Sequence, residues 1–423
     1  MSDMQTAHPA SIPPPPPRKR RGRQLLGAVV GVSILVIVAA AGTAVRAHRT
    51  PDPAPVAIDP QTVRGLRLQW TAAVGPGPAF PTASGDTVYV ATGTSLTAFP
   101  ATCSRTNGEC EARWTDPVPD GALGAPVAQL GAVYTASSVG KLYVFPAQCA
   151  KPSCPPLWIG KAHRRPLSAP GVNSDYAYVA SDRLYAFPAQ CGAGGEECPP
   201  AWTADLPGPA AAAPPASGGG LVLVATRGRE GSVVAFPAAC SQRCQPVWIG
   251  ATGGPATGVT ISGRTAYTVA RGRLLAFPLS CRGKCEPAWT GPFVLGGPLV
   301  QAGAAGRPAV GDGRVYVGDL EGRLWIFPLT CRTASCAALG RVAIGGAPLT
   351  TPVVGDGMVF VISSAGLVTA VQDGCRIGTE SCAPAWSDVL STSAGSSPAA
   401  TSIALYVADD LGTLYAYGLH RAS

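Results

Sequence analysis

The cysteines of this chain follow a repeating pattern that restricts both its fold and its compartment. All fourteen fall into seven short pairs, each placed after an apolar segment that often ends in Phe-Pro, and most placed before a tryptophan. A structural zinc site needs four ligands, whereas each loop offers two cysteines and no adjacent histidine. The pattern therefore predicts one local disulfide in each loop, which implies an oxidising compartment. The predicted pairs are Cys103 with Cys110, Cys149 with Cys154, Cys191 with Cys198, Cys240 with Cys244, Cys281 with Cys285, Cys331 with Cys336, and Cys375 with Cys382.

The predicted bridges are short-range. In the chain-entropy model a closed loop of about six residues contributes only about 2 kcal/mol to stability. We therefore expect the disulfides to staple individual hairpins rather than to determine the fold.

The N-terminal residues carry a membrane-targeting pattern. The uncharged apolar stretch 25–45 is long enough to cross roughly 30 Å of hydrocarbon as a helix. The basic cluster at 18–23 outweighs the two arginines after the stretch, so the positive-inside rule predicts a cytoplasmic N-terminus. A cleaved signal peptide is the alternative, favoured by the alanines at 39–41, but its apolar region spans only about 7 to 15 residues. The predicted parts are a cytoplasmic tail (1–23), a single-pass signal anchor in the cell membrane (24–46), a linker (47–66) and an extracytoplasmic body (67–419).

The positive charge does not indicate nucleic-acid binding. The net charge is +8, but residues 1–50 hold seven Lys or Arg and one Asp, which leaves 25 basic and 23 acidic residues beyond them. A nearly neutral exported body lacks the basic footprint that binding to phosphate backbones requires. We therefore predict no nucleic-acid partner.

The body repeats a unit of about 45 residues. The second apolar strand of the first unit ends at Phe99 and that of the eighth at Tyr417, seven steps later. This period is typical of propeller blades. Four short strands separated by glycine-containing turns are visible within a unit, and β-branched and aromatic residues dominate them. The sequence predicts an all-β, eight-bladed β-propeller.

Tryptophans mark the predicted fourth strands. The sixth unit has Leu339 in this place, and the eighth ends at Tyr417 with no fourth strand. Trp70 precedes the first unit with nothing before it, so we expect it to supply the outer strand of blade eight and close the ring. We expect the tryptophans to pack between blades. They are Trp114, Trp158, Trp202, Trp248, Trp289 and Trp386.

The segment from Gly85 to Trp114, with its Val-Tyr-Val strand, Leu-Thr-Ala-Phe strand and closing tryptophan, resembles the pyrroloquinoline-quinone-like propeller repeat. The stretches 313–327 and 405–417 are similar, and the resemblance covers roughly 67–419. It implies the propeller fold. The chain departs from the family because proline and a disulfide loop replace the usual Asp and glycine turn between the last two strands.

Quinoprotein dehydrogenases of this superfamily bind the quinone on the axis with calcium, an acidic base and an adjacent-cysteine disulfide. This chain has no Cys-Cys dipeptide, and its acidic residues form no recognisable ligand set. We therefore predict no cofactor, metal site or catalytic residue, and expect the acidic residues near candidate loops to be solvated turn residues. They are Asp182, Glu230, Asp319, Glu321, Asp409 and Asp410.

Two classes of function remain open, because fold does not imply function. The first is a non-enzymatic platform, a scaffold or sensor that binds a cell-envelope protein or polymer; related propellers serve as assembly scaffolds and as sensor domains. The second is a quinoprotein-like oxidoreductase or another enzyme with an axial site. Successive turns of a blade alternate between its two ends, so we expect a binding face opposite the disulfide loops. Its most basic segment is predicted at Arg227, Arg229, Arg271 and Arg273.

Overall fold

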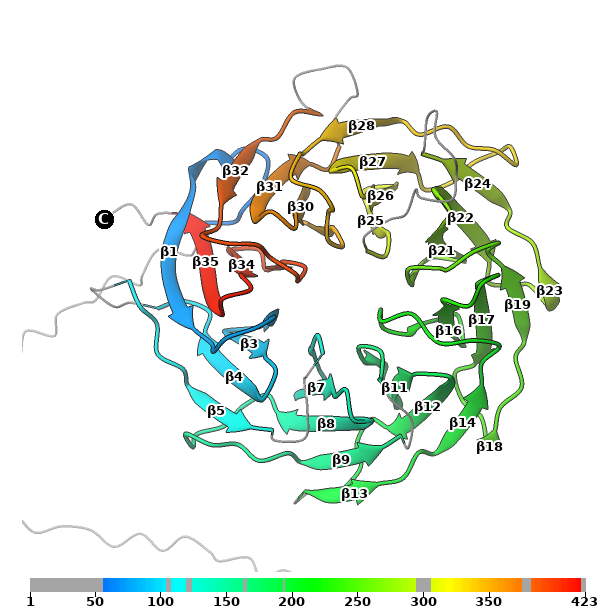
Figure 1. The fold of residues 1–423 in the computed structure, drawn as a ribbon, viewed down its shortest axis with the longest axis horizontal. Helices are drawn as coiled ribbons and strands as arrows, with labels where there is room; N and C mark the ends of the chain where they lie inside the picture. The colour runs from blue at the N-terminus through cyan, green and yellow to red at the C-terminus, as the bar shows by residue number, and fades with distance from the viewer. Residues whose placement is uncertain are drawn as a thin grey trace, which may run out of the picture. The chain divides into compact units, whose positions relative to one another are not determined.

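The computed structural model describes residues 56–419 apart from 104–107, 119–123, 163–165, 193–194, 294–305 and 375–381. These residues belong to the second of two compact units, 54–423. They form eight separate sheets around a central axis, so the all-β, eight-bladed propeller is confirmed (Figure 1). We call each sheet a blade and number the blades from the one that begins with β2 (Phe80–Ser84).

Each blade has four antiparallel strands, ordered from the axis to the rim, and three blades carry a fifth strand that is described below. The first strands are β2, β6 (Val127–Gln129), β10 (Gly171–Val172), β15 (Ala216–Gly218), β20 (Val259–Ser262), β25 (Ala309–Gly311), β29 (Val353–Gly355) and β33 (Ala399–Ala400). The second are β3 (Thr87–Ala91), β7 (Ala132–Ala136), β11 (Tyr176–Ala180), β16 (Leu221–Thr226), β21 (Thr265–Ala270), β26 (Arg314–Gly318), β30 (Met358–Ile362) and β34 (Ala404–Ala408).

The third strands are β4 (Ser95–Pro100), β8 (Lys141–Pro146), β12 (Arg183–Pro188), β17 (Ser232–Pro237), β22 (Arg273–Pro278), β27 (Arg323–Pro328), β31 (Leu367–Gln372) and β35 (Thr413–Leu419). The fourth are β5 (Trp114–Pro117), β9 (Trp158–Lys161), β14 (Trp202–Asp205), β19 (Trp248–Ala251), β24 (Trp289–Pro292), β28 (Gly340–Ala343), β32 (Trp386–Val389) and β1 (Leu66–Ala73). The second and third strands are almost entirely buried because both of their faces pack against a neighbouring blade.

Blade eight takes its outer strand from the other end of the described chain. β1 pairs antiparallel with β35 and places Trp70 opposite Ala416. Trp70 is 3% exposed and packs against Phe99 of blade one and Tyr406 of blade eight. The 3-10 helix η1 (Val63–Gly65) precedes β1, and Val63 is buried in the same core as blades seven and eight. The folded part therefore begins before residue 67, within the range assigned above to a linker.

The tryptophans pack between blades, as predicted. Each begins a fourth strand, and its ring packs with an aromatic residue near the end of the third strand of the next blade, which is a phenylalanine in most blades and Tyr417 for Trp386. Trp114 and Phe145 are 6.4 Å apart between ring centroids, and Trp248 and Phe277 are 6.0 Å apart. In blade six Leu339 lies just before β28 and is 46% exposed, so this blade lacks the aromatic contact.

A second set of contacts joins the blades through tyrosine hydroxyls. The tyrosine in the second strand of one blade donates a hydrogen bond to a carbonyl just after the third strand of the next blade. Tyr89 donates to Ala147 at 2.7 Å, and Tyr406 of blade eight donates to Ala101 of blade one at 2.9 Å. Burial raises the pKa of Tyr178, a member of the set, to about 12, so the donor stays protonated. The other members are Tyr134, Tyr267 and Tyr316.

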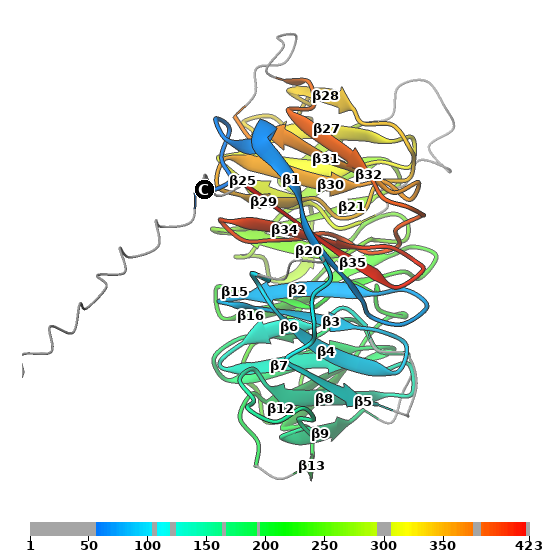
Figure 2. The same cartoon turned by 90° about the vertical axis from the view of Figure 1, so that its left-hand side faces the viewer.

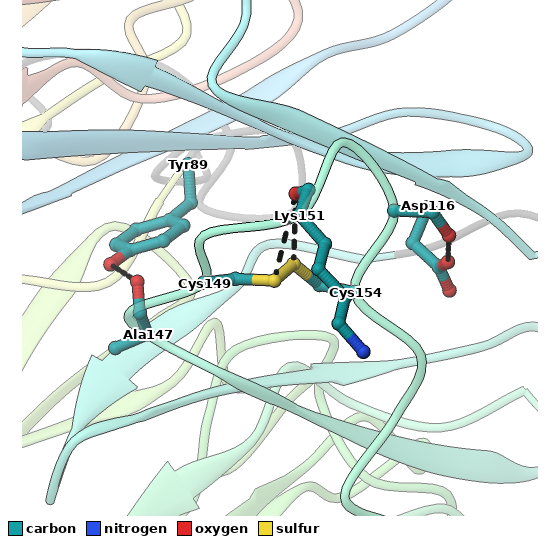
Figure 3. Close-up of a disulfide and its surroundings, with 7 residues drawn as sticks. Tyr89, Asp116, Ala147, Cys149, Lys151 and Cys154 are labelled. Atoms are coloured by element: carbon teal, nitrogen blue, oxygen red, sulfur yellow. Dashed lines mark hydrogen bonds between the residues drawn. A yellow bond between two sulfur atoms is a disulfide. The ribbon is translucent and has the colours of Figure 1, made fainter.

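The disulfide prediction is confirmed for six pairs, with Cα–Cα distances of 5.6 to 6.3 Å. Cys375, of the seventh pair, lies outside the described residues. Figure 3 shows Cys149 and Cys154, whose sulfurs lie 3.7 and 3.6 Å from the Lys151 carbonyl oxygen. In the same loop Ser153 donates a hydrogen bond to Asp116 of blade one at 2.8 Å. The loop therefore contacts the preceding blade.

These loops do more than staple hairpins, which corrects the expectation from sequence. Three of them form an extra strand that pairs in parallel with the outer strand of the preceding blade, at the rim in Figure 1. An ion pair between Lys161 of β9 and Glu197 supports one such junction. We call these loops clasps because each joins two neighbouring blades. The extra strands are β13 (Glu196–Cys198), β18 (Gln242–Arg243) and β23 (Gly283–Cys285).

The predicted anchor, 24–46, lies outside the described residues. Among the residues that are described, no helix has the length and apolar character needed to cross a membrane.

Candidate binding face

The loops of the propeller lie at two ends of the blades. Because the strands are antiparallel, the turn between the second and third strands lies at one end and the clasp between the third and fourth strands lies at the other. Figure 2 shows the blades from the side. We call the end with Arg227, Arg229, Arg271 and Arg273 the arginine face and the opposite end the disulfide face.

The structure places all four arginines at turns of adjacent blades. Arg227 and Arg229 lie in the turn between β16 and β17 of blade four, and Arg271 and Arg273 lie at the turn between β21 and β22 of blade five. All four are exposed. No carboxylate of the described residues forms an ion pair with any of them.

The two turns meet at Gly254. Gly231 of the first turn has a φ of +57°, and a Cβ there would lie 1.8 Å from the Gly254 carbonyl oxygen. A Cβ on Gly254 would lie 2.6 Å from Nε of Arg271. Gly231 is therefore needed for the close approach of the two backbones, while Gly254 lies against the Arg271 side chain, so the arginine-bearing turns pack against one shared segment. Sequence spacing could predict the shared face but not this contact.

A cavity of about 540 Å³ lies at the starts of the first strands, which is the arginine-face end of the blades. Its lining comes from blades around the axis and is mostly proline, alanine and small polar residues. The volume lies within the usual range for small-molecule sites. Its lining includes Phe80, Pro126, Ala213, Arg307, Pro352 and Ser396.

Arg307 is the single ionisable side chain among the described residues of the cavity lining, and the sequence analysis missed it. Burial lowers the pKa of its guanidinium, and no described residue forms an ion pair with its side chain. The preceding segment 294–305 contains no Asp or Glu. Ser396, 3% exposed, has a hydroxyl without a hydrogen-bond partner among the described residues. A sequence signal existed, because an X-Pro pair precedes most first strands and only Arg307-Pro308 places a charge there.

The cavity chemistry does not fit the quinoprotein alternative. Calcium prefers carboxylate and carbonyl oxygens, but the described residues of the lining include no Asp, Glu, His or Cys side chain. Within the described part of the chain, no three such side chains gather in a way that could hold a metal ion. The described part of the lining offers one cation, several hydroxyls and apolar surface, which suits an anion.

Two of the acidic residues expected to be solvated are buried. Asp319 and Asp409 are each 1% exposed. Asp319 accepts hydrogen bonds from the backbone N–H groups of Glu321 and Arg323 and from the Trp325 indole. These carboxylates order the turns of blades six and eight, so the expectation of solvated turn residues was wrong for them. Glu321 and Asp410 also make hydrogen bonds, and Glu230 is exposed.

The fold resembles several solved structures at low sequence identity. BamB from Moraxella catarrhalis has a TM-score of 0.61 and 12% identity, covering 85% of this chain and 99% of that chain. A quinohemoprotein alcohol dehydrogenase from Comamonas testosteroni has a TM-score of 0.63 and 12% identity, covering 86% and 78%. The computationally designed protein Ika8 has a TM-score of 0.64 and 10% identity, covering 83% and 99%. At such identities the similarity shows the fold alone.

No protein-family model matches the chain, and no curated protein matches its sequence. The resemblance to the pyrroloquinoline-quinone-like repeat therefore rests on the sequence motifs alone, and the structural neighbours support the propeller fold. It does not assign an activity.

Proposed function

We propose that this chain is a membrane-anchored, extracytoplasmic β-propeller that serves as a non-enzymatic binding platform in the cell envelope. Residues 24–46 form its single-pass anchor, and its arginine face captures an acidic protein or polymer. The disulfides favour the oxidising side of the membrane. Structural similarity to BamB fits this role without assigning the partner.

One observation carries the proposal. The turns that bear four exposed arginines on blades four and five approach one segment at Gly254, through Gly231 and Arg271, and no described carboxylate forms an ion pair with these arginines. Arg307 adds a guanidinium in the axial cavity at the same end, and no described residue forms an ion pair with it. Guanidinium groups recognise planar carboxylates and phosphates through paired hydrogen bonds. The arginine face is therefore complementary to a negatively charged partner.

The blade frame suits a platform. Tyrosine hydrogen bonds, tryptophan contacts and clasps fix each blade against the next one. The arginine-bearing turns are thus held by rigid elements, which lowers the entropy lost when a partner binds.

A matched pair of variants tests the proposal. One variant replaces Arg227, Arg229, Arg271 and Arg273 with Ser; the control replaces four exposed cations of the disulfide face. Both have the same net charge, so a difference in salt-dependent retention on immobilised poly-L-glutamate reports position rather than total charge. We expect the first variant to elute at lower salt than the control. Equal elution would refute the binding face. The control positions are Lys151, Arg264, Arg282 and Arg332.

The membrane topology has its own test. A reporter that is active only in oxidising compartments should work when fused after Ser423. A cytoplasm-specific reporter that is active at that position would refute the extracytoplasmic assignment. Cell fractionation with and without residues 24–46 separates an anchor from a cleaved signal peptide.

A further inference from the structure

The clasps cover the outer edges of the blades in a regular way. In blades two, three and four the covering segment is an added parallel strand. In blades one, five and eight the covering segment forms backbone hydrogen bonds with the residue that follows the tryptophan of the outer strand. The N–H of Thr115 donates to the Pro152 carbonyl at 3.0 Å, and the N–H of Thr290 donates to the Ala334 carbonyl at 2.9 Å. Thr71 of blade eight donates to Gly108 at 2.8 Å in the same way.

The outer strand of blade seven, β32, differs from these six. No described residue pairs with its outer side. Ser387, Asp388 and Val389 are all exposed, and Val389 is 66% exposed. In most other blades the third residue of the outer strand, such as Ala204, is buried. An exposed strand edge presents unpaired N–H and C=O groups.

The register shows which backbone N–H group of β32 has no partner among the described residues. Trp114 lies opposite Ala98 in blade one, and Trp386 lies opposite Ala370 in blade seven. Ser387 is therefore the equivalent of Thr115, whose N–H points outward to a clasp. We conclude that the N–H of Ser387 points away from β31.

The topology explains why this edge differs. A clasp joins the third and fourth strands of a blade and covers the edge of the preceding blade. In blade eight the third strand is β35 and the fourth is β1, which lie at opposite ends of the described chain. No loop joins them, so blade eight has no clasp to cover blade seven. The sequence has seven cysteine pairs for eight blades, so one blade has no disulfide loop.

We propose that the edge of β32 accepts a short extended segment of a partner protein, which pairs in parallel with β32 through the backbone of Ser387. The three added strands show that this kind of edge takes a parallel strand of two or three residues. Main-chain hydrogen bonds supply most of the recognition, and the exposed Val389 side chain adds an apolar contact. A two-fold dimer would pair two copies of β32 antiparallel, so the observed geometry favours a different chain. This rim site is separate from the arginine face and does not depend on the function proposed above.

Hydrogen exchange of the full chain, read by mass spectrometry, tests whether the edge is free. We expect the amide of Ser387 to exchange at least tenfold faster than those of Thr115 and Thr290. Equal protection would mean that another part of the chain covers β32, and would overturn the proposal.

The second arm uses a disulfide-closed peptide with the sequence of residues 279–287, which contains β23, as the probe. We expect millimolar peptide to slow exchange at 386–389, with no effect at the covered edges. Ser387→Pro removes the amide and should abolish binding, whereas Ser387→Ala keeps the amide and should bind normally. Absence of protection in both the natural chain and Ser387→Ala would overturn the proposal. So would a dimer, seen by sedimentation, that Ser387→Pro dissociates.

Discussion

The two ends of this propeller use their loops in opposite ways. On the disulfide face, loops reach back to the preceding blade, where they form strands, hydrogen bonds and ion pairs. On the arginine face, the turns of blades four and five leave four guanidinium groups exposed. The difference indicates that the clasps hold neighbouring blades together, while the exposed arginine turns are the part that we propose to bind a partner. Substitutions should therefore divide by face into those that change stability and those that change binding.

The largest expected effect is at the junction of blades eight and one. Trp70 is almost fully buried between Phe99 and Tyr406, so Trp70→Ala should lower the free energy of unfolding by about 3 to 5 kcal/mol. Denaturant unfolding measures this change. Trp386 is less buried, so Trp386→Ala is the matched control and should cost less. Equal costs would contradict the packing described for Trp70.

Removing one clasp should have a smaller effect. Replacing Cys191 and Cys198 with Ser should lower the free energy of unfolding by about 2 kcal/mol, since the bridge closes a short loop. Because β13 pairs with β9, hydrogen exchange should also increase at β9 of the preceding blade. If exchange rises only within the loop, the clasps are hairpin staples after all.

The tyrosine hydrogen bonds between blades should contribute more to stability than the exposed arginines do. Tyr134→Phe removes the donor to the Ala189 carbonyl and leaves that acceptor unpaired, so stability should fall by about 1 kcal/mol. Replacing the exposed Arg227 and Arg271 with Ser should change stability by less than about 0.5 kcal/mol. Thermal unfolding distinguishes the two cases. A larger loss for the arginine variant would mean that the arginine face is structural.

The smallest effect is a pH dependence at one clasp. The guanidinium groups of Arg243 in β18 and Arg183 in β12 lower the pKa of Asp205. A lowered folded-state pKa contributes stability that is present above the unfolded value, about 3.9, and is lost as pH falls through the folded value. Asp205→Asn should therefore lower stability only above about pH 4, where the carboxylate is charged. The loss should be small because these groups are solvent-exposed. An equal loss at pH 3 and pH 7 would contradict this ion-pair role.

The repeat made most of the fold predictable. A 45-residue period, the tryptophan positions and the paired cysteines identify the blades, because each reflects a local requirement that recurs in every unit. The clasps were not predictable, since Gly283–Cys285 has no strand pattern until β19 is beside it. Asp319 was misjudged because its burial depends on Trp325 and on a turn that only the structure shows.

The candidate site was only partly predictable. The alternation of turns within a blade predicts which arginines share a face with each other. The approach of their two turns at Gly254 depends on loop geometry, and the axial position of Arg307 depends on how the blades are arranged around the ring. Contacts between residues that are far apart in the chain cannot be predicted from the local pattern of a single sequence.

Site-specific photo-crosslinking in intact cells tests the central claim most directly. A photoreactive residue replaces Glu230 on the arginine face or Arg332 on the disulfide face, both of which are exposed. We expect a discrete crosslinked species from position 230 that disappears when Arg227, Arg229, Arg271 and Arg273 are replaced with Ser, and none from position 332. Crosslinking from position 332 alone, or a product at 230 that survives loss of the arginines, would contradict the account.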